Sequence, residues 1–342
     1  MSMREHLTIG DHTVRRGSIE QIFLKVGEYY TATPVDVQVT VIRGFDAGPT
    51  VFLTAAIHGD ELNGVETVRR VMTSITPEQL RGTLICVPVV NRVGFLTHTR
   101  YLPGRRDLNR YFPGDDGGNS ASRTARTLFR EIVAHSGYGI DLHTASVGRT
   151  NLPHLRAHMS QPEVRSLARA FGSEIIMDSP GLPRTLRAAA TRAGVPTIIL
   201  EAGETFRFQR NMVSYGVNGV MSVLATLAMI DAKPREPRFR VVVKVTERAR
   251  SEHGGIADVL VEPGQIVYQG EAIASITNPF GREVSMVTAP VTGLILGITT
   301  VPMVNPGDAI CHIAKLAKTL GTVERHCVTD STGRKILIVS ST

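Results

Sequence analysis

The strongest structural signal in the chain is the stretch Thr50-Val-Phe-Leu-Thr-Ala-Ala-Ile-His-Gly-Asp-Glu-Leu-Asn-Gly64. The residues up to Ile57 are nearly all apolar, which is typical of a strand covered on both faces of a sheet. From Leu62 to Met72, apolar residues recur at helical spacing. His58 and Glu61 therefore stand at a strand-to-helix turn, where open α/β sheets bind their ligands. The stretch predicts an α/β fold with a site at one edge of its sheet.

Length and composition are those of a globular protein. The chain has 342 residues, enough for about two domains of roughly 150 residues each. Hydrophobic residues make up 42% and charged residues 20%, so a real core is expected. The N-terminus Met1–Leu7 lacks the apolar run of a signal peptide, and no stretch approaches the ~20 apolar residues of a membrane helix. We therefore expect a cytoplasmic protein with no membrane partner.

Cysteine usage and the distribution of basic residues argue against two classes of site. The three cysteines are far apart and form no CxxC pair, which argues against disulfides and against a thiolate zinc site. The formal net charge is +7, but the basic residues are scattered and no nucleic-acid recognition motif is present. We expect no nucleic-acid partner. Clustered arginines between residues 100 and 110 instead suit a small anionic substrate.

Strand and helix patterns alternate along the chain up to about residue 232. This order favours a mostly parallel, mixed sheet with helices on both faces. Predicted strands are residues 37–41, 50–57, 82–91, 139–144, 174–177 and 195–201. Predicted helices begin at Leu62 and also span 122–135, 162–171, 185–193 and 213–229. A turn is predicted at Asp46–Pro49, and a polar loop from the end of the 139–144 strand through His158.

The composition changes after a Pro-containing linker, Lys233–Pro237. Beyond it the pattern is β, including Lys335–Ser340, and residues 267–276 are weakly repeated at 304–313. This half resembles the barrel-sandwich hybrid of biotinyl and lipoyl domains, which implies a small all-β domain. Those domains carry a Lys between the repeats, but the segment Thr277–Met286 has none, so the resemblance implies architecture and no carrier function. The predicted domains are 1–232 and 238–342.

Three predicted strands end in ionisable side chains, which are His58 with Glu61, His143, and Glu201. Two His and one Glu form a ligand set for zinc that leaves one position open for water. Zinc lowers the pKa of that water to about 7. Glu201 is then free to act as general base and later as proton donor to a leaving amine. Asp141 faces the same side of its strand as His143 and could orient an imidazole.

An arginine-rich loop spans Thr99–Gly114 and is long for a simple connection. Asn109 and Arg110 place an amide beside a guanidinium, and Arg binds carboxylates through two parallel hydrogen bonds. Further donors in the loop are Arg100, Arg105 and Arg106. These could stabilise an oxyanion during attack on a carbonyl. From the residues alone, a solvated basic loop is an equally good interpretation.

Four motifs together resemble the succinylglutamate desuccinylase/aspartoacylase family of zinc carboxypeptidase-like hydrolases. They are His58-Gly-Asp-Glu61, Asp107-Leu-Asn-Arg-Tyr-Phe-Pro-Gly114, Asp141-Leu-His-Thr144 and Leu200-Glu-Ala-Gly203, and they occur in the family's order. The resemblance covers about residues 40–230 and implies a zinc carboxypeptidase-like sheet, with the β-domain as the family's usual appendage.

The resemblance also implies roles for single residues. His58, Glu61 and His143 would hold one zinc ion per chain, and Glu201 would be the catalytic carboxylate. The implied substrate-binding residues are Asn109 and Arg110, to which we add Arg105. The family's carbonyl-polarising Arg falls before Asp107, so Arg100 and Arg106 are the catalytic candidates, with Arg105 competing. In some relatives a Tyr of the C-terminal domain contacts the substrate. In the predicted C-terminal domain of this chain, the only Tyr is Tyr268.

The predicted function is a zinc-dependent deacylase that hydrolyses the amide bond of a small N-acyl amino acid or a related compound. Two alternatives are a metallo-carboxypeptidase and an ester hydrolase with the same centre. A third, from another class, is a non-catalytic, metal-containing ligand-binding or scaffold protein. The expected partner is a small substrate that carries a carboxylate. The acyl group, the amine, the role of the C-terminal domain and homo-oligomer formation stay open.

Overall fold

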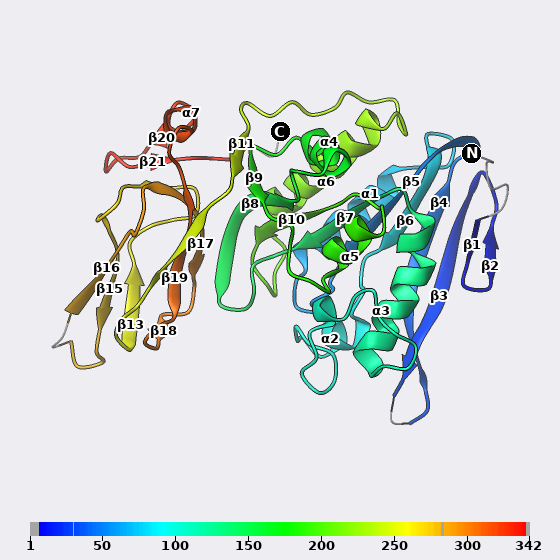
Figure 1. Ribbon diagram of the computed structural model, residues 1–342, viewed down its shortest axis with the longest axis horizontal. Helices are drawn as coiled ribbons and strands as arrows, with labels where there is room; N and C mark the ends of the chain where they lie inside the picture. Colours follow the sequence, from blue (N-terminus) through cyan, green and yellow to red (C-terminus); the bar gives the residue numbers. More distant parts are fainter. Residues whose placement is uncertain (1–6, 30, 282–283, 340–342) are drawn as a thin grey trace.

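The computed structural model describes residues 7–29, 31–281 and 284–339, and its framework is a 13-stranded mixed sheet (Figure 1). β5 (Asp46–Ala55) pairs in parallel with β6 (Arg81–Val87) and with β7 (Tyr138–His143). β7 pairs in parallel with β10 (Thr197–Gly203). The carboxyl ends of these strands therefore meet at one edge of the sheet. The predicted mixed α/β fold is confirmed.

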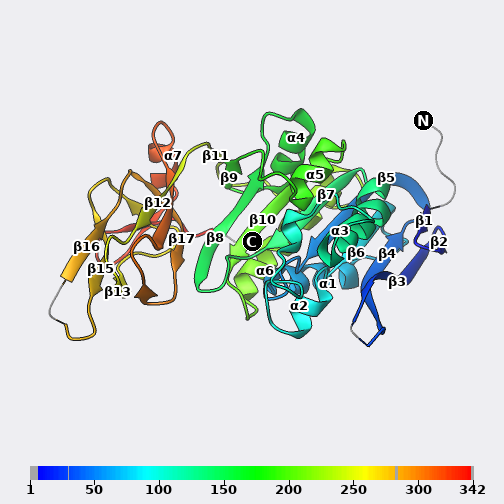
Figure 2. The same cartoon turned by 60° about the horizontal axis from the view of Figure 1, so that its bottom comes forward.

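Helices cover both faces of the sheet (Figures 1 and 2). Side chains of β5 alternate between the faces, so Val51 and Leu53 pack in one apolar cluster and Phe52 in another. The first cluster contains residues of α1 (Asn63–Ser74), α4 (Pro162–Phe171) and α6 (Arg210–Thr226). The second contains residues of α3 (Ser120–Glu131) and α5 (Leu186–Arg192), with α2 (Arg92–Leu96) beside it.

Two local predictions are wrong. The polar loop predicted through His158 contains a nine-residue strand, β8 (Arg149–Ala157), which pairs antiparallel with β10 and with β17 (Gly293–Thr299). Its polar residues hid it from pattern analysis, because several of them face a cavity described below. The turn predicted at Asp46–Pro49 belongs to β5, where the pairing register with β6 shifts between Asp46 and Thr50.

The N-terminal residues extend the sheet at its other end. β3 (Ser18–Glu28) and β4 (Pro34–Arg43) form a long antiparallel hairpin, and β4 pairs with β6. A separate small hairpin, β1 (Leu7–Ile9) with β2 (His12–Val14), lies beside it.

The C-terminal strands form the opposite end of the molecule (Figure 2). β17, β19 (Ala309–Lys315) and β12 (Thr246–Arg250) continue the large sheet beyond β8, and β14 (Ile266–Val267) pairs with β17. A second, four-stranded sheet has the order β16 (Val284–Thr288), β15 (Ala272–Thr277), β13 (Gly255–Val259), β18 (Met303–Val304). One apolar cluster, including Ile273 and Ile313, joins the two sheets. The boundary between residues 232 and 238 stays a prediction.

The remaining elements are β9 (Ile175–Asp178), β11 (Val241–Val243), α7 (Leu320–Glu324), β20 (Val328–Thr329), β21 (Lys335–Ile336) and the short 3-10 helices η1 (Leu108–Arg110) and η2 (Val133–His135). Among the described residues, none of the helices has both the length and the apolar character needed to cross a membrane. Three predictions concern stretches that lie partly outside the described residues. They are the absence of a signal peptide at Met1–Leu7, the absence of Lys from Thr277–Met286, and the β pattern of Lys335–Ser340.

Candidate active site

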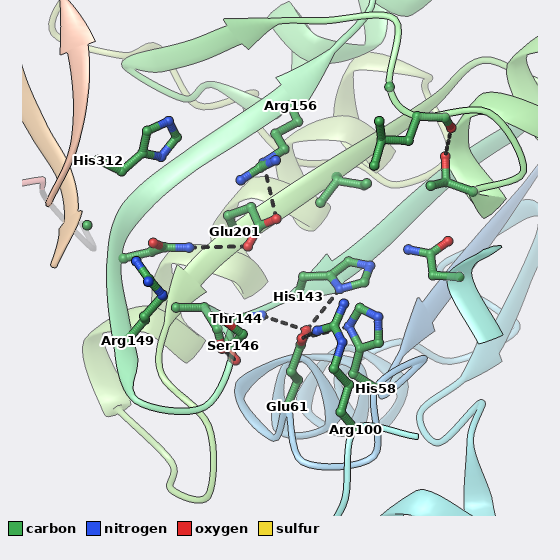
Figure 3. Close-up of a pocket in the computed structure, with 18 of the residues that line it drawn as sticks. His58, Glu61, Arg100, His143, Thr144, Ser146, Arg149, Arg156, Glu201 and His312 are labelled. Atoms are coloured by element: carbon green, nitrogen blue, oxygen red, sulfur yellow. Dashed lines mark hydrogen bonds and ion pairs between the residues drawn. The ribbon is translucent and has the colours of Figure 1, made fainter. Parts of the chain in front are cut away.

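Three buried side chains converge at the carboxyl edge of the sheet, as predicted (Figure 3). His58 follows β5, Glu61 lies in the turn before α1, and His143 is the last residue of β7. The Nδ1 atom of His58 lies 2.6 Å from Oε1 of Glu61, and Nδ1 of His143 lies 2.9 Å from Oε2 of Glu61. One ligand atom from each residue lies within 4.8 Å of the others. This donor set and spacing fit a zinc ion with three protein ligands.

Each of the two imidazoles is held at its other nitrogen by a carboxylate. Nε2 of His143 lies 2.8 Å from Asp141, which also accepts a hydrogen bond from Thr54 Oγ1 at 2.8 Å. Nε2 of His58 lies 3.2 Å from Asp107. Such contacts fix the ring orientation and leave Nδ1 as the nitrogen that faces Glu61. The sequence predicted the contact of Asp141 and missed that of Asp107.

The charges of this cluster favour a cation at its centre. Burial raises the pKa of the Glu61 carboxyl, but His58 and His143 outweigh burial and hold this pKa well below its usual range. Burial lowers the pKa of His143, whereas Asp141 and Glu61 raise it more, to well above its usual value. The same carboxylates that stabilise a protonated ring would stabilise a divalent cation between the rings.

Glu201 lies beside the cluster because β10 and β7 pair in parallel, with Glu201 directly opposite His143. Its side chain lines the same cavity as His58, Glu61 and His143. Asn151 of β8 donates a hydrogen bond to Oε2 of Glu201 at 3.3 Å, and Nε of Arg156 lies 3.1 Å from Oε1. Two neighbours from β8 thus hold this carboxylate in place.

Of the three candidate arginines in the loop Thr99–Gly114, one lies at the cavity and two lie elsewhere. Arg100 lines the cavity, where its guanidinium contacts Glu61 at 3.2 Å and Asp107 at 3.1 Å. Arg105 and Arg106 do not line it. Arg105 has a positive φ of 56° in a tight turn and stacks at 6.0 Å over the ring of Tyr101. Arg106 donates to the carbonyl of Pro103 at 3.0 Å and lines a different cavity. The turn therefore directs both side chains away from the cluster of His58, Glu61 and His143.

Asn109 and Arg110 both line the cavity. Asn109 is buried and accepts a hydrogen bond at 2.8 Å from the backbone N–H of Leu186, so it also fixes the start of α5. Arg110 is half-exposed, and its guanidinium donates to the carbonyl of Asn109 at 2.7 Å. Tyr268 does not line the cavity; its hydroxyl donates to Glu324 at 2.7 Å on the surface.

The cavity has a volume of about 520 Å³, in the usual range for small-molecule sites. Its lining is strongly basic, with two carboxylates, Glu61 and Glu201, against six arginines: Arg100, Arg110, Arg149, Arg156, Arg187 and Arg248. The last four, with His312, are site residues that the sequence did not suggest. Arg149 and Arg156 belong to the missed strand β8, whose sequence Arg149-Thr-Asn-Leu-Pro-His-Leu-Arg-Ala157 shows no regular alternation of polar and apolar residues.

Comparisons with known proteins point to one family. The family model for the succinylglutamate desuccinylase/aspartoacylase catalytic domain matches residues 47–227. N-alpha-acetyl-L-2,4-diaminobutyric acid deacetylase of Halomonas elongata is 27% identical over 301 residues, covering 84% of this chain and 88% of that protein.

Solved structures show the same fold. The succinylglutamate desuccinylase/aspartoacylase of Rhodobacter sphaeroides superposes with a TM-score of 0.80 at 23% identity, covering 87% of this chain and 95% of that chain. The product-bound ectoine utilization protein EutE (DoeB) of Ruegeria pomeroyi also has a TM-score of 0.80, at 21% identity and the same coverage. The family model matches more than half of the residues of this chain, and the chain therefore belongs to the succinylglutamate desuccinylase/aspartoacylase family.

Proposed function

We propose that this protein is a zinc-dependent deacylase that hydrolyses the amide bond of a small N-acyl amino acid. The observation that carries the proposal is the convergence of His58, Glu61 and His143 in one cavity with Glu201. Family membership supports hydrolysis of an acyl bond, and the curated relative is named as a deacetylase of an N-acetyl amino acid. We also propose that the α/β domain has a zinc carboxypeptidase-like fold.

The proposed ligands are Nδ1 of His58, Nδ1 of His143 and the carboxylate of Glu61. When bound, zinc would polarise the scissile carbonyl and lower the pKa of water to about 7. Asp107 and Asp141 would keep the two rings in the ligating orientation through Nε2.

Glu201 is proposed as the proton carrier of the reaction. Its carboxylate accepts a proton from the attacking water and then delivers it to the nitrogen of the leaving amine. Its contacts with Asn151 and Arg156 hold it on the cavity wall beside His143. An unprotonated nitrogen anion is a poor leaving group, so the nitrogen must receive this proton before the C–N bond breaks.

Substrate binding is assigned to the arginine-rich side of the cavity. Arg100 is the one loop candidate whose guanidinium reaches Glu61, so we assign it to the carbonyl oxygen that becomes negative during attack. Asn109 and Arg110 are assigned to the carboxylate of the amino acid.

A hydrolysis screen with zinc-loaded protein tests the proposal. The panel contains N-acetyl amino acids, among them N-acetyl-diaminobutyrate, together with N-succinyl amino acids, dipeptides and amino-acid esters. We expect release of free amine from an N-acyl amino acid, and loss of activity on zinc removal that is restored by zinc. Faster turnover of dipeptides or esters would replace the deacylase with one of the alternative hydrolases. No turnover of any compound would favour a binding or scaffold role.

A further inference from the structure

A separate cavity of about 350 Å³ lies between the β3–β4 hairpin, α2, α3 and the loop Thr99–Gly114, and we call it the hairpin cavity (Figure 1). Its volume is within the range of small-molecule sites. It shares none of its lining residues with the catalytic cavity. Its apolar wall consists of Val26, Val35, Val37, Val90, Val93 and Leu102.

The hairpin cavity exists because one strand lacks a side chain there. Gly27 of β3 lies directly opposite Val35 of β4, next to a shift in the pairing register after Lys25. Side chains at directly opposite positions of an antiparallel pair lie on the same face of the sheet. A Cβ atom at Gly27 would meet no atom within 4 Å. The missing side chain therefore leaves open space beside Val35.

Two guanidinium groups stand at this apolar wall. Arg92 of α2 and Arg106 of the loop both line the hairpin cavity. Arg92 donates a hydrogen bond to the backbone carbonyl of Asp36 at 3.4 Å, and Arg106 to that of Pro103 at 3.0 Å. In the part of the chain that the structure describes, neither guanidinium forms an ion pair with a carboxylate. Both charges are therefore available to an anion.

The other charges around the hairpin cavity leave it basic. Glu28 is the one carboxylate among its described lining residues, and it pairs with Lys25. Ser120, the first residue of α3, also lines the cavity. The N-terminal end of a helix carries a partial positive charge, which adds to that of the two arginines. Positive charge beside an apolar wall suits a ligand that has an anionic head and an apolar body.

We propose that the hairpin cavity binds a small amphipathic carboxylate, such as a medium-chain fatty acid, and that this ligand regulates the catalytic cavity. The carboxylate would accept charge-assisted hydrogen bonds from Arg92 and Arg106. The hydrocarbon chain would pack against the valines and fill the space at Gly27. A short carboxylate lacks the apolar contact, and an uncharged alcohol lacks the head group, so both bind more weakly.

The regulatory part rests on the proposed function and on contacts that join the two cavities. Arg106 is bridged through its backbone to Leu102, and the turn between them follows Arg100 in the same loop. Asn91, the residue before α2, donates a hydrogen bond to the backbone carbonyl of Arg100 at 3.2 Å. A ligand that fixes Arg92 and Arg106 therefore steadies the backbone that presents Arg100 to the substrate. Substrate and ligand should then favour each other's binding.

Calorimetry with octanoate tests the site itself, in zinc-free and in zinc-loaded protein. We expect one octanoate per chain in both forms, and affinities for acetate and octanol that are at least about tenfold lower. Absence of octanoate binding to the zinc-free protein would overturn the proposal. Equal affinity for acetate or for octanol would do the same, because either result removes half of the proposed recognition.

Variants assign the bound octanoate to the hairpin cavity. The double variant Arg92→Met/Arg106→Met should bind octanoate at least about tenfold more weakly, because the head group loses both donors. Gly27→Leu should also weaken binding, because its side chain occupies the open space. Arg123→Met is the matched control, since Arg123 is exposed on α3 and does not line the cavity. Unchanged affinity in the folded double variant would refute the site, whether or not Gly27→Leu folds.

Kinetics with a hydrolysed N-acyl amino acid test the regulation. Octanoate should lower KM about fivefold, and the double variant should lose this effect while Arg123→Met keeps it. Octanoate that competes for the catalytic cavity would instead raise KM, and a raised or unchanged KM would overturn the regulatory role. If zinc-loaded protein hydrolyses no compound, the proposed function fails, and the calorimetric comparison of the variants still decides whether the hairpin cavity is a carboxylate site.

Discussion

The Oδ2 atom of Asp141 lies 2.8 Å from Nε2 of His143, on the opposite side of the ring from Glu61. The ring is therefore clamped between two carboxylates, and Thr54 holds Asp141 in turn. This chain of contacts leaves Nδ1 as the atom that faces the proposed metal position.

Asp141→Asn should weaken zinc binding about 10- to 100-fold, because a neutral amide accepts the Nε2 proton less strongly and leaves the ring a poorer ligand. The zinc dissociation constant can be measured by competition with a chromogenic chelator. Asp231→Asn is a control, since Asp231 is exposed and pairs with Arg81 on the surface. Equal zinc affinity in Asp141→Asn and the unaltered protein would show that the clamp has no effect on the metal.

Glu201→Gln should reduce kcat by about 10² to 10⁴ and leave zinc content at one per chain. Glutamine keeps the size of the side chain but cannot carry the proton, and Glu201 is not one of the three clustered ligand residues. Turnover and metal content are measured on the same sample. Glu204→Gln serves as the control, because Glu204 pairs with Arg207 and does not line the cavity. Near-full activity of Glu201→Gln would remove Glu201 from the mechanism.

Arg100→Ala should lower kcat/KM by about 10² to 10³, the usual loss when a donor to the developing oxyanion is removed. Arg100→Lys should recover only part, since an ammonium cannot bridge Glu61 and Asp107 as the guanidinium does. Arg106→Ala, measured in parallel, should change kcat/KM less than threefold. If Arg106→Ala is the more damaging variant, the assignment of Arg100 is wrong.

His154 should make the protein less stable as the pH falls. It is fully buried, and burial, with a contribution from Arg156, lowers its pKa from the usual 6.5 to about 3. Between pH 6.5 and 3 the unfolded state therefore binds a proton that the folded state does not. The free energy of unfolding should fall with decreasing pH in this window, by up to about 1.4 kcal/mol per pH unit.

The variant His154→Asn checks this origin. Asparagine can keep the hydrogen bond that Nδ1 makes to the carbonyl of Leu152, but it does not titrate. Urea unfolding of the metal-free protein at several pH values should give a shallower pH slope for the variant. A slope equal to that of the unaltered protein would assign the acid sensitivity to other groups, such as His312.

The site was predictable where single strands carry the signal. The apolar run before His58 and the strands before His143 and Glu201 are each visible in the sequence, and parallel pairing places their ends together. Local sequence determines such strand ends, because the chemistry sits immediately after the buried residues.

The basic wall of the cavity was not predictable in the same way. Arg149 and Arg248 meet only because β8, β17, β19 and β12 are neighbours in one sheet, and pairing between distant strands leaves no local pattern. The sequence also did not reveal which arginine side chains of the loop Thr99–Gly114 reach the cavity. Gly104 and Arg105 both have positive φ, and the bridge between Leu102 and Arg106 closes a turn that excludes two of the three candidate arginines.

The pairing of β8 has a consequence for biosynthesis. Only the residues Leu155–Ala157 of β8 pair with β9, whereas Arg149–Asn151 pair with β17. A ribosome releases Gly293–Thr299 long after β8, so the nascent chain exposes an unpaired strand edge and lacks one side of its cavity until its final third emerges. Until Gly293–Thr299 pairs with β8, the edge at Arg149–Asn151 stays open, and the cavity lacks the wall that residues of β12, β17 and β19 supply.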